Sequence, residues 1–214
     1  MDKMLRCSTD EVSLVNKYLG FYQLKAINIP TVPWKQFTTE TELDERLLWS
    51  VRVAVLDSND LNLPRLIGAR SEEACLKGRE LLDRFSDRGL VIYYPYFIAE
   101  KSGVLEISSC RTVIEAVDKD LWNLVTHGRK DVTIVIASAG KSEASQYHGD
   151  PDFLSPEEMS EIKRYAAVIK GRFREDLSEG RSVLAEWSFA YNTDIDKKPI
   201  GGRYLVFYEL RTVR

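Results

Sequence analysis

The 214-residue sequence lacks any apolar run long enough for a membrane-spanning helix, which needs about 18 residues or more. Its first residues, MDKMLRCSTDEVS, also lack the apolar core of a secretion signal. These two absences remove the common signatures of membrane-spanning and exported proteins. We therefore expect a cytoplasmic protein with no membrane partner.

The sequence also lacks an excess of charge of one sign. Its 30 Lys and Arg residues stand against 33 Asp and Glu residues, for a net charge of -3. Non-specific binding of nucleic acid needs a clustered positive surface, so nucleic acid is not an expected partner. An anionic small ligand stays open, because a pocket needs only a few well-placed cations.

Cysteine and histidine are scarce. Cys7, Cys75 and Cys110 are too far apart for a C-x-x-C metal site, and their odd number argues against a disulfide framework. This usage favours a reducing compartment. His127 and His148 are the only histidines in the sequence, so a zinc site is poorly supplied.

The remaining composition is that of an ordinary globular protein, with 44% hydrophobic and 29% charged residues. The length fits one domain of generous size or two small lobes. We expect a single domain over residues 1–214, with a division into lobes of about 1–90 and 91–214 left open.

Alternating and β-branched apolar residues predict a chain with more strand than helix. The expected strands are residues 48–56, 90–94, 103–107, 111–117, 131–137, 183–191 and 203–211. The polar stretch 140–152 is expected to be a surface loop. The fold class is therefore α+β, with mixed or antiparallel sheets and a few packed helices.

Capping signals and apolar periodicity predict two helices. Residues 71–85 form the first, with Ser71 as N-cap. The second begins at Ser155-Pro156, where Glu158 completes a capping box. Its apolar stripe, which we expect to face a sheet, consists of Met159, Ile162, Ala166, Ile169 and Phe173.

The last two strands carry the strongest candidate for chemistry. A hairpin centred between Lys197 and Lys198 places Glu186 opposite Glu209, and opposed residues lie about 5 Å apart. Two such carboxylates repel unless one is protonated or a cation lies between them. Mg²⁺ binds carboxylates together with phosphate oxygens and waters, so a metal site is one interpretation.

The same alternation places Leu205, Phe207, Glu209 and Arg211 on one face of the last strand. Arg211 could then hold a phosphate beside the carboxylates. The alternative is a solvated sheet face on which both glutamates pair with Lys or Arg. A register slip of one residue would also remove the carboxylate pair.

Three motifs near the end of the chain resemble the closing part of the ATP-grasp domain of the phosphoenolpyruvate synthase and pyruvate phosphate dikinase family. LSPEE at 154–158 is similar to the family's L-S-x-E-E, and AEWS at 185–188 is similar to D-I-E-W-A. YELR at 208–211 is similar to L-Q-x-R, with glutamate at 209 where the family has glutamine.

Four upstream segments are similar to the family in the same order. They are residues 27–39, 50–55, 93–107 and 113–136. Arg52 falls on the family's nucleotide-phosphate arginine, and Tyr94 stands where the family has glutamine on the adenine-side strand. Glu115 lies in the matching E-A pair.

The resemblance implies a shortened, divergent ATP-grasp domain that binds ATP with Mg²⁺ and acts as a phosphotransferase. The implied roles are phosphate binding and catalysis for Arg52 and Arg211, further nucleotide contacts for Tyr94 and Glu115, and metal ligation for Glu186 and Glu209. The implied partners are ATP or a related nucleotide and a separate phospho-acceptor protein. A homo-oligomer also stays open.

The departures from the family keep other interpretations open. The family's G-G-K is missing near residues 19–21, and Val53 and Ala54 stand where the family has two serines. The family's phospho-accepting T-S-H-A motif is also missing from this sequence. The alternatives are a degenerate, non-catalytic ligand-binding, structural or oligomerisation module, and an unrelated α+β protein.

Overall fold

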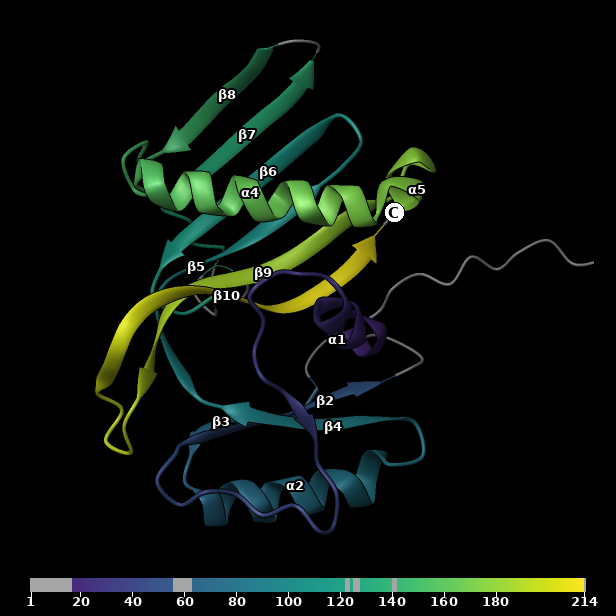
Figure 1. The fold of residues 1–214 in the computed structure, drawn as a ribbon, viewed down its shortest axis with the longest axis vertical. Helices are drawn as coiled ribbons and strands as arrows, with labels where there is room; N and C mark the ends of the chain where they lie inside the picture. The colour runs from purple at the N-terminus through teal and green to yellow at the C-terminus, as the bar shows by residue number, and fades with distance from the viewer. Residues whose placement is uncertain (1–16, 56–62, 122–123, 125–127, 140–141, 214) are drawn as a thin grey trace, which may run out of the picture.

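A computed structural model describes residues 17–55, 63–121, 124, 128–139 and 142–213. Within these ranges the strands form two sheets with antiparallel neighbours, and helices cover them, which confirms the α+β class. The larger sheet lies above the smaller one in Figure 1. None of the helices in these ranges is long and apolar enough to cross a membrane.

The smaller sheet has the strand order β1-β4-β2-β3 and is covered by one helix. Its elements are β1 (Lys35–Gln36), β2 (Trp49–Val55), β3 (Arg65–Ala69), β4 (Gly89–Pro95) and α2 (Ser71–Phe85). Val51, Val53 and Val55 of β2 share a buried cluster with Leu81 of α2. The alternation that predicts the strand is therefore the alternation that packs it against α2.

The larger sheet has the order β10-β9-β5-β6-β7-β8. Its strands are β5 (Phe97–Ile107), β6 (Arg111–Asp118), β7 (Val132–Ala139), β8 (Ser142–Gly149), β9 (Ser182–Thr193) and β10 (Pro199–Val213). Only Tyr96 separates β4 from β5, so the chain passes from one sheet to the other at that point.

One face of the larger sheet is covered by α4 (Pro156–Arg172), which α5 (Arg174–Ser178) follows. The predicted capping box is present, because the Ser155 hydroxyl accepts a hydrogen bond from the Glu158 amide and the Glu158 carboxylate accepts one from the Ser155 amide. Ile162 and Ile169 are fully buried in one cluster with Trp187 of β9. The predicted apolar stripe of α4 therefore packs against this face of the sheet and excludes water from it.

Helix α1 (Lys17–Ala26) packs on the edge strand β10, and the sequence does not predict it. Its polar and apolar residues alternate too irregularly to give a clear helical stripe. Contact with β10 requires Gly20, because a Cβ there would lie 1.9 Å from the carbonyl oxygen of Leu210. The following segment then pairs with β10 through a parallel bridge between Thr31 and Phe207.

Three local predictions need correction. Residues 142–149 of the expected loop form β8, which pairs with β7 at the edge of the sheet. An edge strand that is open to solvent can pair through its backbone without apolar side chains. The polar sequence of β8 therefore lacks the apolar alternation from which a strand is predicted. β3 was also not predicted, and Arg70, without a side-chain cap, takes the N-cap position expected for Ser71.

Candidate functional site

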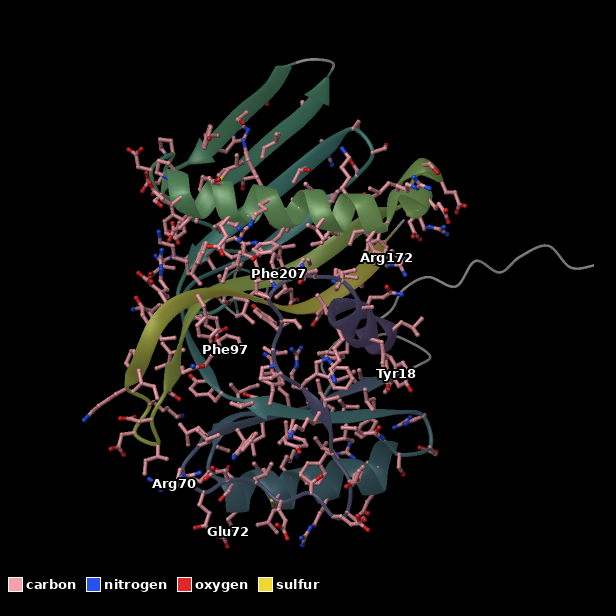
Figure 2. The ribbon with its side chains drawn as sticks, viewed as in Figure 1. Tyr18, Arg70, Glu72, Phe97, Arg172 and Phe207 are labelled. Carbon is pink, nitrogen blue, oxygen red and sulfur yellow. The ribbon has the colours of Figure 1, made fainter. Side chains whose placement is uncertain are left out.

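The space between the two sheets is filled mainly by apolar and aromatic side chains. Phe97, labelled in Figure 2, lies in this space together with Tyr94 of β4 and Tyr208 of β10. Tyr94 is 3% exposed and Tyr208 is 8% exposed. The charged groups described below are therefore surrounded by low-polarity neighbours, which strengthens electrostatic interactions among them.

The expected carboxylate pair is confirmed, because Glu209 of β10 is the register partner of Glu186 of β9. The expected common face of Leu205, Phe207, Glu209 and Arg211 is wrong. Phe207 packs with the α4 cluster and Tyr208 joins the cluster between the sheets. The register shift between Phe207 and Glu209 then places Glu209 on the same side as Tyr208, where it meets Arg52. A β-bulge of this kind re-aims the side chains that follow it.

Arg52 reaches this pair from the smaller sheet. Its Nη2 lies 3.0 Å from Oε2 of Glu209, and the two side chains are 12% and 4% exposed. Burial opposes the charge on Arg52, but Tyr94, Glu209 and Glu186 outweigh it and raise the pKa of the guanidinium. Arg52 therefore stays charged and links the two sheets through an ion pair.

A short chain of hydroxyls extends from the charged cluster. The Tyr208 hydroxyl lies 3.5 Å from that of Ser188, which lies 2.8 Å from the hydroxyl of Ser102. Ser102 donates to the carbonyl of Lys119, after β6. Burial and the nearby Glu186 raise the pKa of Tyr208, so this phenol stays protonated. Sequence reasoning did not predict this chain of hydroxyls, because no periodic pattern shows that a bulge places Tyr208 and Glu209 on the same side of the sheet.

The other two predicted site residues lie at the margins of the cluster. Val104 of β5 pairs with both Glu186 and Glu115, so Glu115 is two strands, about 10 Å, from Glu186. Glu115 is bonded to Lys130. Arg211 is half-buried, and its register partner on β9 is Leu184. The structure therefore groups Arg52, Tyr94, Glu186 and Glu209, leaves Arg211 beside them, and separates Glu115.

The donor set fits Mg²⁺ only in part. Among the described residues, no group of three or more His, Cys, Asp or Glu side chains is placed to hold a metal ion. The opposed carboxylates of Glu186 and Glu209 suit a magnesium ion whose remaining ligands are phosphate oxygens and waters. Cys7 and His127 lie outside the described residues.

An open cleft of about 370 Å³ lies along the same space between the sheets. Three parts of the chain contribute to its wall: the connection Pro95–Phe97, the segment Thr31–Pro33, and Tyr204 and Val206 of β10. The cleft is largely apolar, and its aromatic rings are those of Tyr96, Phe97 and Tyr204. It can take a planar, weakly polar group, and Arg52, Glu186 and Glu209 are not among the residues that line it.

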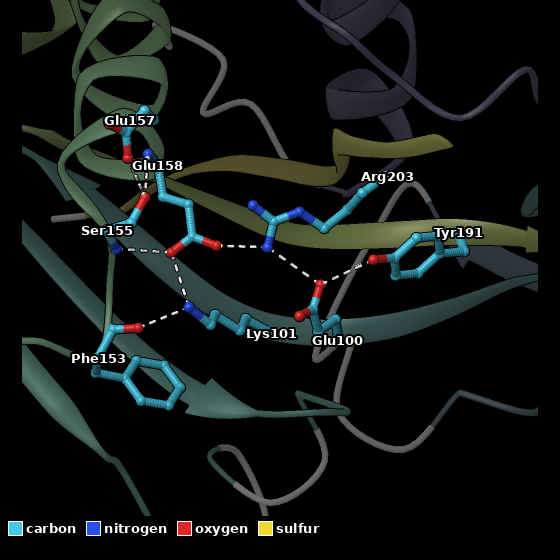
Figure 3. Close-up of polar contacts among 8 residues, drawn as sticks. All are labelled: Glu100, Lys101, Phe153, Ser155, Glu157, Glu158, Tyr191 and Arg203. Atoms are coloured by element: carbon cyan, nitrogen blue, oxygen red, sulfur yellow. Dashed lines mark hydrogen bonds and ion pairs between the residues drawn. The ribbon is translucent and has the colours of Figure 1, made fainter. Parts of the chain in front are cut away.

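A second polar cluster, on the α4 face of the larger sheet, was not predicted (Figure 3). Glu158 is 2% exposed and accepts hydrogen bonds from Lys101 at 2.8 Å and from Arg203 at 2.6 Å. Arg203 also donates to Glu100. We call Lys101, Glu158 and Arg203 the Glu158 clamp. It joins the first turn of α4 to β5 and β10, which gives Lys101 a structural role.

No family model matches the chain, and no curated protein matches it either.

Proposed function

We propose that this protein binds ATP as its magnesium complex between the two sheets. The observation that carries the proposal is the buried meeting of Arg52 from β2 with Glu186 and Glu209 from β9 and β10. Cationic and anionic groups from two sheets converge there, and an apolar cleft opens at another point of the same space between the sheets. Such a combination suits a ligand with a charged end and a planar, weakly polar end.

In this proposal each group has a defined task. Glu186 and Glu209 would hold Mg²⁺, which when bound would neutralise phosphate charge. Arg52 and Arg211 would bind phosphate oxygens. The aromatic wall of the cleft would take the adenine base by stacking. Positioning and charge neutralisation are the main demands of phosphoryl transfer, so the parts suit a phosphotransferase-like domain.

The resemblance to the phosphoenolpyruvate synthase and pyruvate phosphate dikinase family supports the same assignment, as an ATP-grasp-like domain. Transfer to a separate phospho-acceptor protein is a further part of the proposal. The free thiols of Cys75 and Cys110 support a cytoplasmic location.

A second candidate is a relative that binds a ligand or serves a structural role without turnover. The buried Tyr94, Tyr208 and Leu121 favour it, because they fill part of the space between the sheets. Val53 and Ala54, which replace polar residues of the family, favour it too. The two candidates differ in turnover, and only the first requires binding of ATP as its magnesium complex.

Calorimetric titration with ATP, with and without Mg²⁺, tests the proposal. We expect binding that depends on the metal, and Glu186→Gln should weaken it about 10-fold or more, since a carboxylate ligand is lost. Glu106→Gln is the matched control, because Glu106 lies on β5 and contacts Arg111 instead of Arg52. An affinity that Glu186→Gln leaves unchanged would remove the metal from the proposal.

A further inference from the structure

The acidic and basic groups of the proposed site are bonded to each other. Nη2 of Arg52 lies 3.0 Å from Oε2 of Glu209, and both side chains are almost fully buried. Glu186 lies opposite Glu209 and also attracts Arg52. A phosphate that binds Arg52 and a metal ion that binds Glu209 must therefore compete with this internal ion pair.

The charges decide which ligand can replace it. A divalent cation that enters alone must bind the Glu209 carboxylate, so the buried Arg52 loses its bonded partner while a second positive charge lies close to it. A polyphosphate that enters alone must bind Arg52 while two carboxylates repel it. Either step leaves a buried charge poorly compensated, which is unfavourable. When both enter, Arg52 moves to phosphate, Glu209 moves to the metal, and each buried charge keeps an opposite neighbour.

We infer that the Arg52–Glu209 ion pair is a latch that admits the metal–polyphosphate complex and excludes either component alone. This inference rests on the proposed function and specifies the form in which its ligand enters. The metal and the phosphate chain bind cooperatively, because each one compensates the residue that the other releases. The bulge at Tyr208 is what aims Glu209 at Arg52, so the latch is built into the β9–β10 ladder.

Removing the negative charge of the latch tests the inference. Glu209→Gln keeps a side chain of the same shape and removes the carboxylate to which Arg52 is bonded. Calorimetry in EDTA should then show that metal-free ATP and sodium tripolyphosphate bind about 10-fold more tightly to the variant than to the wild type. Glu106→Gln, which removes a carboxylate from the same face of the sheet, should leave metal-free affinity unchanged.

Removing the positive charge gives the complementary test. Arg52→Gln leaves two opposed carboxylates without their arginine, so Mn²⁺ or Mg²⁺ alone should bind about 10-fold more tightly than to the wild type. Thermal melting and circular dichroism of each variant show whether it is folded. Glu209→Gln is the milder change and keeps the inference testable if Arg52→Gln does not fold.

The outcomes separate the latch from the proposed function. If the wild type binds Mg–ATP but Glu209→Gln binds metal-free ATP no more tightly than the wild type, the latch is overturned and the proposed function stands. If neither the wild type nor either folded variant binds ATP, tripolyphosphate or metal, the proposed function is overturned and the latch with it.

Discussion

Glu186 and Glu209 lie directly opposite each other on β9 and β10, and the residue that precedes Glu209 points to the same side of the sheet. The bulge at Tyr208 produces this arrangement, since regular alternation would send Tyr208 and Glu209 to opposite faces. The bulge therefore supplies both a carboxylate and a phenol to the space between the sheets. That space also receives Arg52, so the charged core of the molecule depends on one irregularity in one ladder.

The Arg52–Glu209 ion pair should be strongly coupled in stability. Arg52→Met leaves a buried carboxylate uncompensated, so we expect the free energy of unfolding to fall by about 3–5 kcal/mol. Arg52→Met combined with Glu209→Met should lose less than the single change, because no buried charge of the pair remains. Urea denaturation of the wild type and the variants measures this coupling.

The surface pair of Arg111 and Glu106 provides the comparison. Its atoms are 3.7 Å apart and Arg111 is 55% exposed, so Arg111→Met should change the free energy of unfolding by less than about 1 kcal/mol. Equal effects of Arg52→Met and Arg111→Met would show that the interior ion pair is not formed in solution.

The Glu158 clamp should hold α4 on the larger sheet. Glu158→Ala leaves Lys101 and Arg203 without their buried carboxylate and removes half of the capping box, so we expect a loss of about 3 kcal/mol. Glu157→Ala, in the same helical turn but exposed, should cost less than about 1 kcal/mol. Chemical denaturation of both variants checks the ranking, and a similar loss in both would contradict the clamp.

The clamp also predicts a dependence of stability on pH. Burial alone would raise the pKa of Glu158, but hydrogen bonds from Lys101, Ser155 and Arg203 outweigh it and hold this pKa below its ordinary value. A lowered pKa in the folded state means that the stabilisation is complete above the unfolded value, about 4.3, and is lost as the pH falls through the folded value.

Glu158→Gln isolates this contribution. The difference in unfolding free energy between wild type and Glu158→Gln should be largest near pH 7 and shrink below about pH 4. Denaturation series at several pH values measure the difference, and one that grows on acidification would have the wrong sign for a carboxylate held in its charged form.

Two helical glycines should respond in opposite directions to the same substitution. Gly20→Ala places a methyl group 1.9 Å from the carbonyl oxygen of Leu210, so α1 must move away from β10 and the protein should lose several kcal/mol. Gly171→Ala in α4 meets nothing within 4 Å and should stabilise the protein by up to about 1 kcal/mol. Thermal melts of the two variants decide whether α1 packs as described.

The sequence predicts a helix or strand well where one of its faces is buried against the core. The valines of β2 and the apolar stripe of α4 both point into closed clusters, so their periodicity is strong. β8 and α1 were missed for the opposite reason. β8 is a polar edge strand that relies on backbone pairing, and α1 depends on one close backbone approach at Gly20.

The candidate site was predicted in part, and one step of that prediction was wrong. The Glu186–Glu209 pair follows from a hairpin centred between Lys197 and Lys198, yet Thr193 pairs with Pro199, which centres the turn on Asp196. Register shifts between Ile200 and Tyr204 and again at Tyr208 restore the pairing. No periodic pattern contains such shifts, and none could reveal that Arg52 meets Glu209 from another sheet.

The most direct test of nucleotide binding between the sheets is a crystal structure of the protein grown with Mg²⁺ and a non-hydrolysable ATP analogue. We predict the metal about 2.1 Å from carboxylate oxygens of Glu186 and Glu209, with phosphate oxygens on Arg52 and the ion pair between Arg52 and Glu209 broken. A nucleotide bound elsewhere, or crystals at saturating analogue in which the Arg52–Glu209 ion pair is intact and the space between the sheets holds no nucleotide, would contradict the account.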